Sequence, residues 1–116
     1  MTTNFEFTIL LSGDDEVKKL NNKFRKKNQT TDILSFPFQD KRVLNKLLKK
    51  KTKIYLGDII INLNKITNKI EDKNFFFNFD KIWIHGVVHL LGYRHKSNHD
   101  FLIMAKLENK LIKFLK

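Results

Sequence analysis

Three of the chain's four histidines lie close together, in the segment Trp-Ile-His-Gly-Val-Val-His-Leu-Leu-Gly-Tyr-Arg-His between residues 83 and 95. His85 and His89 are four residues apart, so on a helix they share one face, one turn apart. Gly92 can adopt the left-handed conformation that ends a helix, after which the chain can fold back and bring His95 toward the other two. Three neutral imidazoles converging from one side can hold a transition metal and leave a position open for water. The pattern therefore predicts a catalytic metal site formed by His85, His89 and His95.

The spacing His-x-x-x-His-x-x-Gly-x-x-His is also that of the metzincin metallopeptidases. In those enzymes the residue after the first histidine is a Glu that acts as the general base of peptide hydrolysis, and here it is Gly86. The metal ligands are kept and the peptidase base is missing, so peptide hydrolysis is an alternative rather than the favoured chemistry. The fourth histidine, His99, has no periodic relation to the others, and we expect it on the surface.

The length and composition indicate one intracellular domain spanning residues 1–116. Hydrophobic residues make up 41% of the chain, including eleven Phe, which is enough for a core. The chain has no Cys, which excludes disulfides, Cys-ligated zinc and thiol catalysis and fits a reducing cytoplasm. The N-terminus does not read as a signal peptide, and no apolar run has the length of a membrane span. We therefore expect a cytoplasmic protein with no membrane partner.

The formal net charge of +11 favours a polyanionic partner, above all nucleic acid. Lys outnumbers Arg twenty to three, however, which a biased genome also produces, so the charge supports such a partner without establishing one. The basic residues are densest between Lys41 and Lys53, with seven in thirteen positions. This run is open to two interpretations, contact with RNA or a solvated insertion.

Three segments have the apolar patterns of β-strands: Phe5–Leu11, Thr31–Phe38 and Ile54–Leu63. Pro37 cannot donate to a β-ladder, so the second strand is predicted at the edge of the sheet. Gly57 and Asp58 interrupt the third strand and predict a bulge or a close backbone approach there.

Helices are predicted around these strands. Ser12, Gly13 and Asp14 can form a turn and cap a helix that Arg25 closes. A turn or two of helix is expected within residues 41–53, a weaker polar helix over 64–72, and a final amphipathic helix over 97–116 with Met104 in its core stripe.

The segment Phe75–Phe79 lies just before the histidines and has an ambiguous pattern. It can be a fourth strand, but Asn74 and Asn78 favour a connection packed on the core. Asp80 is then the expected cap of the histidine helix.

Taken together, these segments resemble the YbeY-type endoribonucleases, also called rRNA maturation factors. The resemblance runs from the first strand to the last helix. It is carried by four blocks in the same order: Leu20-Asn21 with Phe24-Arg25; Thr31-Asp32-Ile33-Leu34-Ser35-Phe36-Pro37; Leu56-Gly57-Asp58-Ile59-Ile60; and His85-Gly86-x-x-His89-Leu90-Leu91-Gly92-Tyr93-x-His95.

The resemblance implies an α+β fold, with a small mixed β-sheet of about four strands packed against helices and a metal site at the end of a core helix. It implies one ion, most often zinc, on His85, His89 and His95. The implied activity is that of a metal-dependent, single-strand-specific endoribonuclease in small-subunit ribosomal RNA 3′-end maturation and ribosome quality control. Its partners would be ribosomal RNA and also ribosomal proteins or a ribosome-associated GTPase. Arg25 and His85 match the residues that this family links to activity.

The residues themselves leave several roles open. The guanidinium of Arg25 can grip two phosphate oxygens, or it can be a cation favoured at a helix end. Asp32 and Asp58 can orient a ligand histidine or serve as structural hydrogen-bond acceptors, the role we favour. Arg94 stands where the family commonly has Asp, next to His95. A non-catalytic rRNA-binding assembly factor therefore stays as a further alternative.

Overall fold

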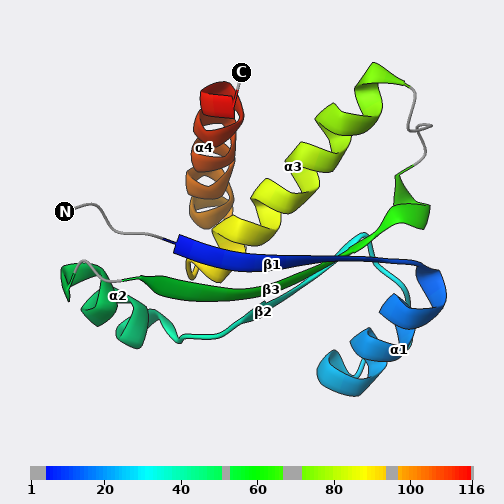
Figure 1. Cartoon of the computed structure of the whole chain (residues 1–116), viewed down its shortest axis with the longest axis horizontal. Helices are drawn as coiled ribbons and strands as arrows, with labels where there is room; N and C mark the ends of the chain where they lie inside the picture. The colour runs from blue at the N-terminus through cyan, green and yellow to red at the C-terminus, as the bar shows by residue number, and fades with distance from the viewer. Residues whose placement is uncertain (1–4, 51–52, 67–71, 94–96, 116) are drawn as a thin grey trace.

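The computed structural model describes residues 5–50, 53–66, 72–93 and 97–115, and the side chains up to residue 113. Its elements follow in the order β1 (Phe5–Ser12), α1 (Asp14–Arg25), β2 (Ile33–Pro37), α2 (Lys41–Lys50), β3 (Ile54–Asn62), a short 3-10 helix (Leu63–Lys65), α3 (Lys73–Leu90) and α4 (Asn98–Leu115) (Figure 1).

Within the described residues, the sheet has three strands in the order β1-β3-β2. β1 runs parallel to the central β3, and β2 runs antiparallel to it, so the sheet is mixed, as predicted. β2 lies at an edge and ends at Pro37, which confirms that prediction. The small mixed sheet of about four strands that the resemblance implies is present with three strands in the described residues. The ambiguous segment Phe75–Phe79 is helical.

The predicted irregularity of β3 is present next to Gly57. Glu6 of β1 pairs with Tyr55, but Phe7 pairs with Gly57, so Leu56 is an extra residue on β3. Gly57 has φ 142°, and a Cβ there would lie 2.3 Å from the carbonyl oxygen of Phe36. Only glycine is accommodated at such a bulge, where two strands approach closely.

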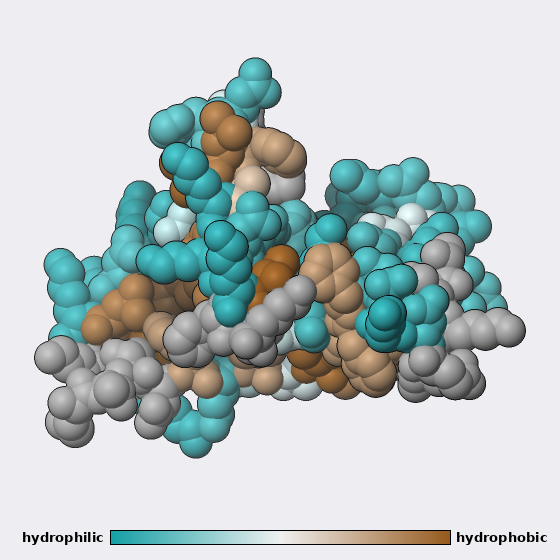
Figure 2. All heavy atoms as spheres, turned by 90° about the horizontal axis from the view of Figure 1, so that it is seen from above, coloured by the Kyte–Doolittle hydropathy of each residue, from teal (hydrophilic) through white to brown (hydrophobic). Residues whose placement is uncertain are grey.

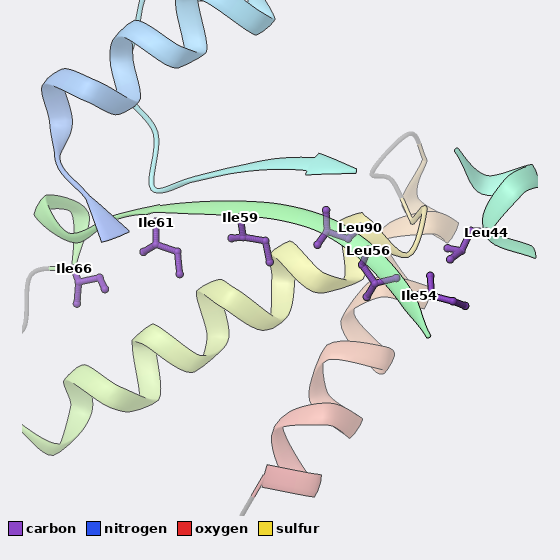
Figure 3. Packing of buried hydrophobic residues seen from close by; sticks show 7 residues of the cluster. All are labelled: Leu44, Ile54, Leu56, Ile59, Ile61, Ile66 and Leu90. Carbon is purple, nitrogen blue, oxygen red and sulfur yellow. The ribbon is translucent and has the colours of Figure 1, made fainter. Parts of the chain in front are cut away.

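The two faces of the sheet pack against different helices (Figure 1). On one face, β3 side chains such as Ile59 and Ile61 point toward α3, and Leu44 of α2 joins the same cluster (Figure 3). On the other face, Val17 of α1 packs against Leu34 and Ile60. α3 therefore lies directly on the sheet, which places its histidines beside the edge strand β2.

The histidine helix α3 begins earlier than predicted, at Lys73 rather than near Asp80. Its cap is Asp72, whose carboxylate accepts a hydrogen bond from the backbone N–H of Asn74 at 2.9 Å. The rings of Phe75 and Phe79 stack with their centroids 6.2 Å apart, as residues one helical turn apart can. Asp80 accepts a hydrogen bond from Trp83 Nε1 instead of capping the helix.

The last helix, α4, packs on α3 through Met104, which is buried among Ile84 and Val88, as predicted. Of the polar helix predicted over residues 64–72, the described residues form the 3-10 turn Leu63–Lys65. Residues 67–71 of that prediction lie outside the described part of the chain. Apolar side chains also reach the surface in places, as the brown atoms among the teal ones in Figure 2 show. Phe76 of α3 and Phe101 of α4 are among the exposed large apolar side chains. No helix in the described residues combines the length and apolar character needed to span a bilayer.

Candidate metal and nucleic-acid site

The imidazoles of His85 and His89 meet on one side of α3, within its last two turns. Their Nε2 atoms are 3.0 Å apart, and their ring planes are nearly perpendicular, at 86°. The helix ends at Leu90, and Gly92 follows with φ 100°, the conformation predicted for it. The predicted i, i+4 pairing of the two histidines on one helical face is therefore confirmed.

The other ring nitrogens of this pair are held by acceptors. Nδ1 of His89 lies 2.8 Å from the carbonyl oxygen of Tyr93, and Nδ1 of His85 contacts a carboxylate oxygen of Glu108. A carbonyl or carboxylate oxygen can only accept, so we assign the proton of each neutral imidazole to Nδ1. Both Nε2 lone pairs then face each other, an arrangement that a proton or a metal ion between them would stabilise. This donor set fits a metal ion.

Glu108 contacts the histidine pair but is absent from the candidates that the sequence suggests. It lies on α4, 23 residues after His85, and its side chain is 22% exposed. A signal was present: Glu108 follows Met104 by four and precedes Leu111 by three, so an acid stands on the buried stripe of an amphipathic helix.

The third predicted ligand, His95, lies outside the described residues, as does its neighbour Arg94. Among the residues that are described, no group of three His, Cys, Asp or Glu side chains is arranged to hold a metal. The structure thus brings together two of the three predicted ligands, and the role of His95 stays a prediction. His99 is exposed at the start of α4, as expected.

Arg25 reaches the same site from the end of α1. The helix ends after it because Lys26 takes a left-handed conformation, with φ 56°, and the N–H groups of Lys26 and Lys27 bond back to α1 carbonyls. Nη2 of Arg25 donates to the carbonyl oxygen of Ser35 at 2.5 Å, and the guanidinium lies 5.6 Å from the centre of the Phe36 ring. These contacts direct the guanidinium toward β2.

Arg25, His85 and His89 line one groove of about 650 Å³, which we call the histidine groove. The other walls come from β2 and from the loop before it, including Lys27 and Asp32. That loop is anchored from below by Asn62, which is fully buried and donates to the hydroxyl of Thr30 at 2.9 Å. The groove therefore combines a pair of potential metal ligands with a fixed guanidinium.

Gly86 faces the sheet rather than the histidine groove. A Cβ at this position would lie 2.7 Å from Cδ1 of Ile33 and 3.0 Å from Cδ1 of Ile59. The position that carries the general base in the metzincin motif is thus packed closely against the sheet. A Glu side chain would be directed into this packed interface.

The two acids considered as supports for the histidines differ in their surroundings. Asp58 accepts a hydrogen bond from the hydroxyl of Tyr55, which is also 2.6 Å from the hydroxyl of Thr8, so its role is structural. The hydrogen bond to Asp58 is the main reason that the pKa of Tyr55 is raised above 10.0. Asp32 is exposed on the wall of the histidine groove, where its carboxylate accepts from the Thr31 hydroxyl at 3.3 Å.

Fold and site together define a small α+β domain with a paired-histidine centre in a partly basic groove. The model of the family described as Endoribonuclease YbeY matches residues 1–116. The chain belongs to this family.

Relatives named "Endoribonuclease YbeY" support the same assignment. The chain is 46% identical over 112 residues to the one from Pelagibacter ubique, covering 94% of this chain and 69% of the relative. It is 39% identical over 112 residues to the one from Thermodesulfovibrio yellowstonii, covering 94% of this chain and 66% of the relative. It is 42% identical over 107 residues to one from Buchnera aphidicola, covering 90% of this chain and 64% of the relative. The chain therefore spans about two thirds of the length of these relatives.

A solved structure has a similar fold. The solution structure of TM1509 from Thermotoga maritima matches with a TM-score of 0.59 at 25% identity, covering 95% of this chain and 67% of that one.

Proposed function

We propose that this domain is a metal-dependent endoribonuclease that cuts single-stranded RNA, with the ion held by His85, His89 and His95. The observation that carries the proposal is the convergence of two Nε2 atoms, 3.0 Å apart, in the groove that Arg25 also lines. The names of the relatives support the endoribonuclease activity.

The residues around the histidines hold both rings in an orientation that suits metal binding. Glu108 and the Tyr93 carbonyl hold the two rings at Nδ1, which fixes the ring directions and turns both Nε2 atoms toward the same point. When bound, a zinc-like ion would supply Lewis-acid chemistry: it polarises a phosphoryl oxygen and lowers the pKa of a water to about 7. Converging imidazole donors suit zinc.

Arg25 has the role of binding the phosphate. A guanidinium has five N–H donors in a planar fork, and one of its nitrogens already donates to Ser35, which fixes the orientation of the others. From this position Arg25 can donate to the phosphate that lies at the histidines and stabilise the negative charge that develops there. Lys27, in the same groove, adds a second cation for the RNA backbone.

The proposed substrate is ribosomal RNA, at the 3′ end of the small-subunit molecule, with a further part in ribosome quality control in the cytoplasm. Ribosomal proteins or a ribosome-associated GTPase would then bring the enzyme to its site. This finer role rests on the family resemblance, and the net charge of +11 fits an RNA partner.

A purified-component assay tests the proposal. The wild-type chain, depleted of metal and then given zinc, is incubated with a single-stranded RNA and with the same RNA annealed to its complement. We expect zinc-dependent cleavage of the single strand alone. His85→Ala should abolish this cleavage, whereas the control His99→Ala should leave it unchanged. RNA binding without cleavage under any metal would favour the non-catalytic assembly factor instead.

A further inference from the structure

A second hollow, of about 620 Å³, lies next to the histidine groove and shares His89 and Pro37 with it. Its lining includes Phe38, Lys41, Tyr93, Asp100 and Ile103, and we call it the aromatic hollow. Because one imidazole borders both spaces, a chain that lies across the histidines can enter both. A pocket of this volume is in the range that takes a small organic ligand.

Phe38 is an unusual surface residue at the rim of this hollow. It is 68% exposed, the most exposed of the large apolar side chains in the described part of the chain. Its position is nevertheless fixed: its backbone N–H donates to the Leu56 carbonyl at 2.9 Å, and its ring packs edge-on against Tyr55, with centroids 5.6 Å apart. A fixed aromatic ring with an open face is a platform on which a nucleobase can stack.

The rest of the hollow favours a nucleoside over a phosphate. The Nζ atom of Lys41 lies 5.7 Å from the centre of the Tyr93 ring, so this cation is already close to an aromatic face. The carboxylate of Asp100 repels a phosphate, but it can accept a hydrogen bond from a base amino group or a ribose hydroxyl. A base and its ribose therefore match the interior better than an anion does.

The phosphates that flank such a nucleoside have a basic surface nearby. α2, which begins at Lys41, has five Lys or Arg among its ten residues and no Asp or Glu. Leu44 is buried in the core and fixes which side of α2 faces inward. The basic residues at the end of the helix, Lys49 and Lys50, are exposed to solvent.

We propose that the aromatic hollow is a nucleoside subsite of the RNA substrate. It takes the base of the nucleotide adjacent to the phosphate at the histidines, stacked on Phe38, while the following backbone continues along α2. The inference rests on the proposed function and adds a reason for single-strand specificity, because a base must be unpaired to enter the hollow.

Binding to the metal-free chain tests this inference without any need for cleavage. The probes are a short single-stranded RNA and a series of copies in which one nucleotide at a time is made abasic. In the wild-type chain, we expect one abasic position to weaken binding by about fivefold to 100-fold, the usual effect of losing one base–aromatic stack. Phe38→Ala should weaken binding of the intact RNA by a similar factor.

The two changes should not add, because they remove the same contact. In Phe38→Ala the abasic copy should bind as the intact RNA does. In the control Phe76→Ala, which removes another exposed ring, on α3, the abasic loss should remain complete.

Equal affinities of the wild type and Phe38→Ala, or an abasic loss that stays unchanged in Phe38→Ala, would overturn the subsite. This failure is distinct from failure of the proposed function. A chain that shows the coupled losses in binding but never cleaves RNA has the subsite without the activity. A chain that cleaves RNA with no abasic loss has the activity without the subsite.

Discussion

The carboxylate of Glu108 contacts Nδ1 of His85 where α4 crosses α3, and the opposite nitrogen of the same ring faces His89. A carboxylate in this position holds the imidazole in one tautomer and makes Nε2 a better donor to a metal. Glu108 thus holds one of the predicted ligands in place from a helix that contributes no predicted ligand itself.

Glu108→Ala should weaken zinc binding by about 10-fold to 100-fold, the usual effect of losing such a support. Glu108→Gln should retain part of the affinity, because the amide oxygen can still accept from Nδ1 but has no charge. Competition with a chromophoric chelator measures both dissociation constants without reference to activity. Glu16→Gln, an exposed change on α1, is the control. Equal zinc affinities of Glu108→Ala and the wild type would show that the carboxylate does not support the site.

Gly86→Glu restores the residue that metzincins have after the first histidine, and we expect it to disrupt the fold rather than create a peptidase. The new side chain would meet Ile33 and Ile59 and bring a charge into the interface of α3 with the sheet. The free energy of unfolding should fall by about 3 to 5 kcal/mol. Denaturant unfolding measures it, with Lys81→Glu, at an exposed position of α3, as the control. A stable variant that hydrolyses casein would contradict this account and revive the peptidase alternative.

Arg25→Lys tests whether the fork of the guanidinium matters or only its charge. Lysine keeps the charge but cannot donate to Ser35 and to two phosphate oxygens from one plane. We expect the cleavage rate constant to fall by roughly 10²-fold or more, with zinc affinity unchanged. Single-turnover cleavage measures the rate constant, and metal titration measures the zinc affinity. Lys113→Arg on α4 is the control for exchanging one basic side chain for another. A wild-type cleavage rate constant for Arg25→Lys would show that only the positive charge of Arg25, at the end of α1, matters.

Removal of the Asp58 carboxylate should lower the pKa of Tyr55 toward its ordinary value, because the hydrogen bond to Asp58 is what raises it. In the wild type, the neutral phenol is favoured in the folded state. Its contribution to stability is therefore complete below pH 10.0 and is lost as the pH rises through the raised pKa. Ultraviolet titration measures the pKa of Tyr55 in two proteins that both carry Tyr93→Phe, so that Tyr55 is the sole tyrosine. One of the two also carries Asp58→Ala, and the difference between their titrations is the effect of the carboxylate. An unmoved titration would mean that another group raises the pKa.

Much of the fold could be predicted because its signals are local. The apolar runs of β1 and β3, Pro37 at the edge and the end of α1 at Arg25 each follow from a few neighbouring residues. The start of α3 could not be predicted this way. Its first turns carry Phe on several sides of the helix rather than along one stripe, and Asp80 is a second candidate cap that lies nearer the histidines than Asp72 does.

In the site, too, the local relationships could be predicted and the contacts between distant elements could not. His85 and His89 are one helical turn apart, so their pairing follows from the spacing alone. The meeting of Arg25 with them depends on how α1 and α3 are placed around β2, and only the family resemblance indicated it. The contact with Glu108 depends on the packing of α4 on α3, which no local pattern specifies.

Metal analysis of the purified chain tests the central claim most directly. We expect about one zinc-like ion per wild-type chain, and no stoichiometric metal in His85→Ala, His89→Ala or His95→Ala, while His99→Ala should load as the wild type does. A wild-type chain that takes up no divalent transition metal from a metal-supplemented buffer would contradict the account, and loss of metal in His99→Ala would show that the ligands are wrongly assigned.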